Sequence, residues 1–401
     1  MPLTSRRLRT PQLGRSIPPS KGVPSDADLD RLSHVADAPA DDAVAEYFET
    51  VGPARADLFQ HLAAATADGV VDEDLPGIGP FLRRRDAWPT WADPEIVRDG
   101  QRVFGEFGPQ LGLGLFMASL PSDYASKNGV QVLARTNQLT RQPQRRFIET
   151  GQLILDVMTP GRLDLGGVGY TSVRHVRLMH AAVRHVIANA EQISKQTGIE
   201  ITPWDDSYGL PVNQLHLLGT LLSFSVEGTE SLESVGVRLS AYHTEAYVHV
   251  WNLVGHLMGI SDDLLPLSWG DSRILWDQRR QREQGPSTEG KALTAAAIGC
   301  MQGMLASNRL AGLPASGIRH YLGDATAEWL AVPPSNWTKT LFQVMRVVDR
   351  AYDVSLVRLP VMSPFAAILG RQIWRGFEAH ERQGDRPNFE VPQELARAWG
   401  L

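Results

Sequence analysis

Apolar residues recur at helical spacing along almost the whole chain, and this periodicity decides the fold class. Strand-like alternation with hairpin turn pairs is nearly absent. Asp93 and Pro94 are typical of a helix start, since an N-cap residue is followed by proline at the first helical position. We expect two helices within residues 26–66. Further helices are expected near residues 94–106, 143–158, 171–195, 211–226, 231–260, 288–307, 316–331, 338–350 and 365–381. The sequence therefore predicts an all-α fold.

The 401 residues divide into three predicted segments. Residues 1–25 are rich in proline, serine and arginine and are expected to form a disordered tail. Residues 26–80 predict an N-terminal helical extension, and residues 81–401 a single large helical domain. The tail holds a paired arginine but lacks the apolar stretch of a signal peptide. We therefore expect a cytoplasmic protein.

Composition excludes several classes of partner and site. Lys and Arg number 39 against 45 Asp and Glu, and a net charge of −6 is no footprint for nucleic acid. No run of apolar residues is long enough to predict a membrane-spanning helix. The single cysteine, Cys300, excludes a disulfide framework within the chain and a zinc site of several cysteines. It also excludes a c-type haem, whose attachment needs C-x-x-C-H.

Histidine is concentrated in one part of the chain. Seven of the 11 histidines lie between His175 and His256, where a uniform spread would place about two. One predicted helix carries an apolar seam with a histidine at its centre, made of Val173, Val176, His180, Val183 and Ile187. The arginines of this helix, among them Arg177 and Arg184, lie off the seam.

Three more histidines lie on predicted buried faces. His249 and His256 share one face of a helix two turns apart, and His216 lies in a segment that is apolar nearly all round. A buried imidazole needs hydrogen-bond partners, so each of these histidines taken alone has a structural interpretation. Because several such histidines lie on separate helices, a metal or cofactor pocket and a structural role are equally consistent with the pattern.

The sequence narrows the chemistry of such a pocket. No histidine has Asp or Glu three residues before it, which disfavours a di-iron carboxylate site, and the zinc motif H-E-x-x-H is absent. A haem needs one axial histidine, an apolar cavity and arginines for its propionates. His180 with its neighbouring arginines meets that minimum.

A second seam carries polar side chains where apolar ones would be expected. Arg146, Thr150, Leu153 and Val157 share one face of the helix predicted at 143–158. A charged side chain on a core face is costly unless it is paired or faces a polar ligand. Arg146 and Thr150 could donate to one oxygen species, with Glu149 beside them as an acid; an arginine that snorkels or pairs with an acid is the structural alternative. Nucleophile-elbow, P-loop and dinucleotide-binding motifs are absent.

Several segments, in this order, resemble the latex-clearing protein family of rubber oxygenases and the related MpaB-type oxygenases. They are PTWADP at 89–94, R-x-x-x-T at Arg146 and Thr150, VRLMHAAVRH at 176–185, His216 in a leucine-rich helix, HVWNLVGHLMGISDDLLPLSW at 249–269, TEG at 288–290 and HYLGDATAEWLAV at 320–332. The resemblance implies a globin-like core holding one haem b (iron). It also implies insertion of dioxygen across an isoprenoid C=C bond, which makes residues 81–401 a haem-binding oxygenase catalytic domain.

The resemblance assigns roles to individual residues. His180 would be the iron ligand, His185 a structural or propionate-side histidine, and Arg146 with Thr150 the distal pair. The other histidines, His216, His249 and His256, would lie near the pocket without binding iron.

Two positions depart from the family pattern. Family members can carry a lysine before the distal threonine that caps the iron; here that residue is Glu149, which leaves the sixth ligand open and which we expect to pair with Arg146. The nearest counterpart of the family's catalytic glutamate is Asp123. Because secreted rubber degraders carry an export signal, a solid extracellular polymer is not the expected substrate.

Our hypothesis is a haem-dependent oxygenase that acts on a hydrophobic unsaturated small molecule or polyisoprenoid with dioxygen. His180 would bind iron, Arg146 and Thr150 would stabilise charge on bound oxygen, and Glu149 or Asp123 would act as acid or base. The alternatives are a non-enzymatic haem carrier or sensor, and a helical protein without a cofactor. The oligomeric state stays open, with a monomer as the default expectation.

Overall fold

The computed structural model describes residues 22–52, 75–84, 87–140, 143–198, 200–305 and 307–354. These residues form helices, and none of them belongs to a named strand. The helices are α1 (Asp26–Leu32), α2 (Ala38–Val51), α4 (Ile78–Arg83), α5 (Pro94–Gly114), η2 (Leu115–Ser119), α6 (Leu120–Tyr124), α7 (Gly129–Thr140), α8 (Pro143–Met158), α9 (Val168–Ala188), α10 (Ala190–Thr197), η3 (Asp206–Tyr208), α11 (Gln214–Leu222), η4 (Ser223–Glu227), α12 (Gly228–Ser234), α13 (Ala241–Leu257), α14 (Trp269–Glu283), α15 (Thr288–Gly303), η5 (Asn308–Leu310), α16 (Leu313–Trp329) and α17 (Lys339–Val354). The all-α prediction is confirmed.

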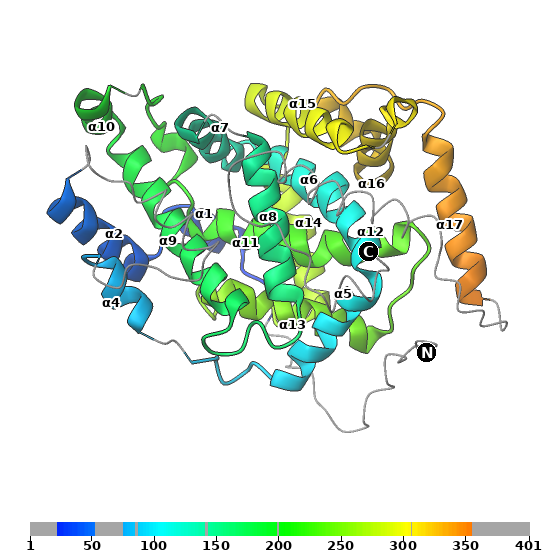
Figure 1. Ribbon diagram of the computed structural model, residues 1–401, viewed down its shortest axis with the longest axis horizontal. Coiled ribbons are helices and arrows are strands. Elements are labelled where there is room, and N and C mark those ends of the chain that lie inside the picture. The colour runs from blue at the N-terminus through cyan, green and yellow to red at the C-terminus, as the bar shows by residue number, and fades with distance from the viewer. Residues whose placement is uncertain are drawn as a thin grey trace.

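Two apolar clusters form the core, and helix α9 belongs to both of them. The larger cluster gathers side chains from α5, α8, α11, α13 and α14, with Phe104, Tyr247 and Trp276 among those fully buried. The smaller cluster joins α2 and α4 to the opposite side of α9. Figure 1 shows α2 and α4 at one end of the molecule, beside α9, and α17 at the other end. The N-terminal helices therefore cover the outer side of α9.

Helices α5 and α13 cross closely at the centre of the larger cluster. A Cβ at Gly100 would lie 2.2 Å from the carbonyl oxygen of Ala246, so the crossing requires glycine. The start of α5 follows the prediction, because Asp93 accepts hydrogen bonds from the N–H groups of Glu95 and Ile96 and Pro94 follows it. This crossing fixes the position of α13, the helix that carries His249 and His256.

The expectation of one helix over 231–260 is wrong. Helix α12 ends at Ser234, and residues 235–240 interrupt the segment with Gly236 at φ +97°. Ser240 then starts α13 by accepting a hydrogen bond from the N–H of His243. The helix expected at 171–195 is likewise divided at Asn189 into α9 and α10. Residues 365–381 lie outside the described part of the chain.

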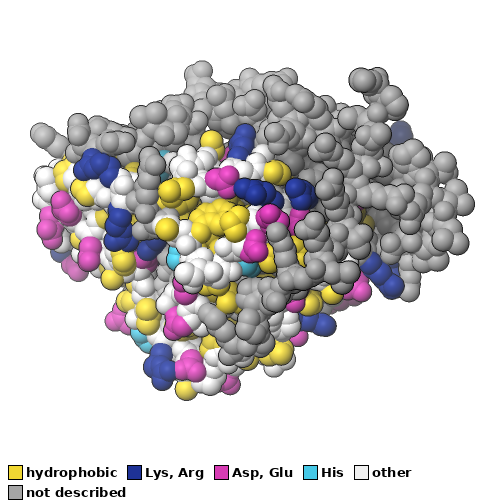
Figure 2. Space-filling view, turned by 90° about the horizontal axis from the view of Figure 1, so that it is seen from below, with side chains coloured by type: hydrophobic (Ala, Val, Ile, Leu, Met, Phe, Trp, Pro, Cys, Tyr) yellow, Lys and Arg dark blue, Asp and Glu magenta, His cyan; other side chains and the backbone are white. Residues whose placement is uncertain are grey.

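Charged side chains of both signs are interspersed among apolar ones on the surface drawn in Figure 2. No helix within the described residues has the length and hydropathy needed to cross a membrane.

Candidate functional site

Helix α9 carries the histidine on which the sequence prediction rests. The two ends of its apolar seam are buried at Val173 and Ile187, whereas Val176 and His180 in the middle are half-buried. The seam therefore reaches accessible space at its centre.

Helices α8 and α9 form a hairpin that is closed at one end by a buried carboxylate. Asp156 accepts hydrogen bonds from Ser172 Oγ at 3.0 Å and from Arg162 Nη1 at 2.9 Å. Thr150 precedes Asp156 by six residues and His180 follows Ser172 by eight, so the helical rise places them about 9 and 12 Å from the closure. Thr150 and His180 therefore lie at similar levels on adjacent helices, and both are half-buried.

The other two residues predicted on α8 are less constrained by the structure. Glu149 is exposed, and the side chain of Arg146 lies outside the described part of the chain. The expected pairing of these two residues stays a prediction.

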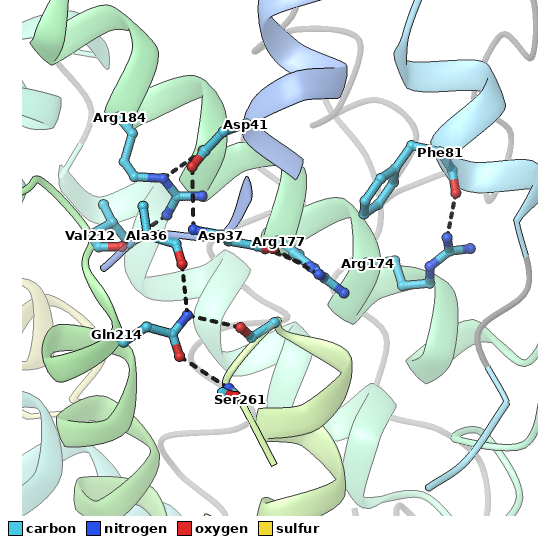
Figure 3. A network of polar contacts seen from close by, with 11 residues as sticks. Ala36, Asp37, Asp41, Phe81, Arg174, Arg177, Arg184, Val212, Gln214 and Ser261 are labelled. Carbon is cyan, nitrogen blue, oxygen red and sulfur yellow. Dashed lines mark hydrogen bonds and ion pairs between the residues drawn. The ribbon is translucent and has the colours of Figure 1, made fainter. Parts of the chain in front are cut away.

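Both arginines that bracket His180 bind carboxylates of the N-terminal extension (Figure 3). Arg177 donates from Nε and Nη2 to the two carboxylate oxygens of Asp37, at 2.6 and 2.8 Å. Arg184 donates from Nε to Asp41 at 2.7 Å and from Nη1 to the carbonyl of Val212 at 2.9 Å. Burial raises the pKa of Asp41, and the Arg184 guanidinium opposes that rise. These acids belong to α2 and its N-cap.

His185 also faces the N-terminal extension. Its ring stacks on Phe48 of α2, with centroids 4.3 Å apart and planes 6° from parallel. Burial lowers the pKa of His185, and the carboxylates of Asp41 and Glu49 oppose this effect. The structure thus gives this histidine a packing role against α2.

His249 and His256 surround the indole of Trp91. His249 Nε2 accepts a hydrogen bond from the backbone N–H of Asp93 at 3.0 Å, and burial lowers the pKa of His249 to about 4. His256 Nδ1 lies 2.6 Å from an oxygen of Asp262. Both rings contact Trp91 edge-on, at centroid distances of 5.5 and 6.3 Å. Through these contacts the two histidines of α13 link the residues at the start of α5 to α13 and to the loop that follows it.

His216 and Asp123 lie in a different place, near the buried guanidinium of Arg279. Burial and this positive charge lower the pKa of His216 to about 3. Burial raises the pKa of Asp123 to about 7, an effect opposed by Arg279 and by the hydrogen bond from Ser223 Oγ at 3.0 Å. Glu227, one turn after Ser223, has its pKa raised by burial to about 8.

This second group lies where two π-helices meet. Ser119 of η2 donates to the carbonyl of Ser223, the first residue of η4, at 2.6 Å. π-Helices occur frequently at functional sites because the extra residue turns side chains out of the regular register. Sequence reasoning selected Asp123 and His216 here but missed Ser223, Glu227 and Arg279. Helical periodicity covers most of η4 without marking its polar side chains as a group, and α14 was not predicted.

Sequence reasoning also missed Asp37 and Asp41. A signal was present, because arginines on a buried helix require carboxylate partners, and the segment 37–42 is the acidic stretch DAPADD. Which acids pair with which arginines cannot be read from spacing, since 140 residues separate Arg177 from Asp37.

His180 and Arg279, around which the two groups of candidate residues lie, both fall in the part of the chain that matches known proteins. The model of the ER-bound oxygenase mpaB/B′/rubber oxygenase catalytic domain matches residues 101–351. The chain belongs to this family. Membership confirms the expected resemblance, and the matched part includes α8, α9, α11 and α13.

Two relatives in this family define how far the likeness reaches. The rubber oxygenase of Streptomyces sp. (strain K30) is 27% identical over 240 residues, which cover 56% of this chain and 53% of that protein. The match thus spans about half the length of the curated relative. The structure of the latex clearing protein LCP in the closed state superposes with a TM-score of 0.69 at 20% identity, covering 90% of this chain and 94% of that one. At this identity the structural likeness is one of fold.

Proposed function

We propose that the chain is a haem b-dependent oxygenase that uses dioxygen to cleave or oxygenate C=C bonds of a hydrophobic, isoprenoid-like substrate. The observation that carries the proposal is the position of His180, half-buried at the centre of the α9 seam within the family's catalytic domain. When bound, the haem supplies the binding and activation of dioxygen.

The residues around His180 fit a haem. An imidazole can bind haem iron, and the apolar seam around His180 would suit a macrocycle. Arg184, one turn further along α9, keeps a buried Nη2 that makes no hydrogen bond with any described residue. A buried donor of this kind can bind a propionate, since the unsatisfied group is costly without a partner. His180 and Arg184 are therefore our candidates for holding the cofactor.

The residues on α8 would act on dioxygen and the substrate. Thr150 lies at a similar level to His180 on the adjacent helix, and with Arg146 it would donate hydrogen bonds to an oxygen species. Asp123 is a second candidate for proton transfer, because burial raises its pKa to about 7, but it lies in the group around Arg279 and not in the group around His180. Glu149 is exposed, so it would reach the reaction only where the pocket opens to solvent.

An apolar substrate suits the half-buried seam residues. Leu153 on α8 and Val176 on α9 are apolar side chains that remain partly accessible beside Thr150 and His180. The Streptomyces relative is named a rubber oxygenase, which supports a polyisoprenoid as the substrate class. Dioxygen adds both of its atoms across one C=C bond and gives two carbonyl ends.

The test begins with the absorption spectrum of the purified full chain after reconstitution with hemin. We expect one haem for each chain, loss of the Soret band in His180→Ala, and its retention in His175→Gln. His175 is the matched control, because it is a buried neutral histidine on the same helix whose pKa is lowered to about 4. A chain that binds no haem would overturn the proposal.

The second part of the test identifies the reaction. Linear isoprenoids of increasing length are supplied with ¹⁸O₂, and carbonyl products are analysed by mass spectrometry. Label in both carbonyl ends supports dioxygen insertion. Bound haem without dioxygen-dependent loss of any isoprenoid would instead support the carrier or sensor.

A further inference from the structure

The two carboxylates that bind the α9 arginines come from outside the family's catalytic domain. Asp37 and Asp41 precede residue 101, where the match to the family begins. They are one turn apart on α2 and its N-cap, whereas Arg177 and Arg184 are two turns apart and bracket His180. One short acidic segment therefore binds α9 at one position before and one position after His180 in the sequence. Figure 3 shows both ion pairs.

The side chain of Asp37 binds Arg177 in place of the backbone N–H groups at the start of α2. Asp37 is the N-cap residue of α2, yet its side chain makes no capping hydrogen bond and instead binds Arg177 through both oxygens. Both side chains are buried, with 3% of Asp37 and 11% of Arg177 exposed. A bidentate pair fixes orientation as well as distance, so it defines the rotation of α9 about its axis.

Neighbouring segments are shaped to enclose this pair. A Cβ at Gly259 would lie 2.3 Å from Asp37 Oδ2 and 2.7 Å from Arg177 Nε, and Gly259 has φ +91°. Gln214 donates its amide to the carbonyls of Ala36 and Gly259 and accepts from the N–H of Ser261. The ion pair is thus enclosed by the loop after α13, by the start of α11 and by the residue before Asp37.

Charge neutralisation follows from the same geometry. Arg177 and Arg184 would place two positive charges beside His180 in a poorly hydrated region, where charges interact strongly. The two carboxylates cancel them. Loss of one carboxylate would leave net positive charge next to the bound cofactor, and positive charge favours the reduced form of an iron centre.

We propose that Asp37 and Asp41 are positioning residues for His180, which set the orientation of α9 and the electrostatic potential at the haem. The inference rests on the proposed function, because it concerns the bound haem. It gives the N-terminal extension a role in the chemistry of a site to which it contributes no ligand.

The experiment measures the ferric/ferrous reduction potential of the full haem-loaded chain in a set of matched variants. Asp37→Asn should raise the potential, because it leaves Arg177 uncompensated. Arg177→Gln should lower it, because it leaves Asp37 uncompensated. The double variant should return close to the wild-type value, since a neutral pair replaces a neutral pair. Asp42→Asn is the control, because Asp42 is exposed on the same helix, and it should leave the potential unchanged.

The sign pattern separates positioning and charge from mere loss of fold. A structural defect would move both single variants in the same direction and would not be reversed in the double variant. Asp41→Asn serves as a second variant if Asp37→Asn does not fold. The Asp41 side chain is 31% exposed, so solvent screens part of the charge that its removal leaves on Arg184. Asp41→Asn should raise the potential by a smaller amount.

The outcomes distinguish this inference from the proposed function. Wild-type chain that binds no haem overturns the proposed function itself. Wild-type chain that binds haem while Asp37→Asn and Asp41→Asn match the potential of Asp42→Asn overturns the positioning role alone.

Discussion

At the scale of single residues, α9 tolerates buried arginines because carboxylates and backbone carbonyls of other elements pair with them, although Nη2 of Arg184 makes no hydrogen bond with any described residue. Arg177 and Arg184 bind carboxylates, and Arg174 donates to the backbone carbonyls of Phe81 and Leu82 on α4. Removing one partner from such a pair typically costs about 3–5 kcal/mol, because the remaining charge is left buried. These arginines therefore tie the N-terminal helices to the helix that carries His180.

Gly259→Ala tests how tightly the Asp37–Arg177 pair is enclosed. The new methyl group would occupy the space of the pair at a backbone conformation with φ +91°. We expect a loss of about 1–3 kcal/mol in the free energy of unfolding, measured by urea titration. Gly299→Ala on α15 is the control: a Cβ there meets nothing within 4 Å, so it should gain roughly 0.5–1 kcal/mol. Equal effects in both variants would contradict this picture.

Thr150→Val removes one hydroxyl while keeping the shape of the side chain. If Thr150 donates to an oxygen species, turnover should fall by about 10²–10³, with haem content unchanged. The measurement is dioxygen consumption with an isoprenoid substrate, normalised to the Soret absorbance. Wild-type turnover in this variant would return Thr150 to a packing role.

Residue roles were only partly predictable from spacing. The helical period correctly placed His249 on a buried face, but its hydrogen bond to Asp93 joins residues 156 positions apart and follows from the crossing of α5 and α13. Burial raises the pKa of the Cys300 thiol to about 11, which is typical of a packing cysteine.

At the scale of elements, the α8–α9 hairpin sets the level of Thr150 against that of His180. Its closure depends on Asp156, which is 3% exposed and accepts from Ser172, Arg162 and Gln152. The bounds of α8 were predicted to the residue, because its apolar face repeats with the helical period, whereas α5 continues to Gly114 beyond the predicted end at 106. Helix α14 was missed because charged residues cover most of its surface, although Arg279 is buried within it.

Asp156→Ala should loosen this hairpin. Three donors would lose their acceptor in a buried place, so we expect a loss of about 3–5 kcal/mol in the free energy of unfolding. Asp164→Ala is the matched control, because Asp164 is exposed in the loop of the same hairpin and should stay within about 0.5 kcal/mol of wild type. Denaturant titration followed by circular dichroism measures both. Equal stability of the two variants would show that Asp156 does not hold the α8–α9 hairpin closed.

At the scale of the whole molecule, the assembly of the site could not be predicted from one sequence. Periodicity gave the all-α fold, and the resemblance gave the family. The grouping of predicted residues into two places, one around His180 and one around Arg279, depends on contacts between elements far apart in the chain. Both groups contain titratable side chains whose burial couples protonation to folding.

The pH dependence of stability is the prediction that belongs to this scale. The pKa of Asp123 is raised from 3.8 to about 7 and that of Glu227 from 4.5 to about 8, both chiefly by burial. The folded state therefore holds protons that the unfolded state has already lost. Stability must fall as pH rises until each folded pKa is passed, by about 1.4 kcal/mol per pH unit for each group still protonated.

Buried histidines act in the opposite sense, around and below their ordinary pKa of 6.5. Burial lowers the pKa values of His175 and His249 to about 4 and that of His216 to about 3, so the unfolded state binds protons that the folded state does not. Their contribution is complete only about one pH unit above 6.5, and it is lost as pH falls. From about pH 7.5 to 8.5 the buried carboxyl groups therefore decide the slope, and the free energy of unfolding should decrease. Glu227→Gln should flatten this limb, whereas Asp164→Asn at an exposed site should leave it unchanged. Urea titrations at half-unit pH steps measure the slope, and a free energy that rises from about pH 7.5 to 8.5 would show that neither buried carboxyl keeps its proton in the folded protein.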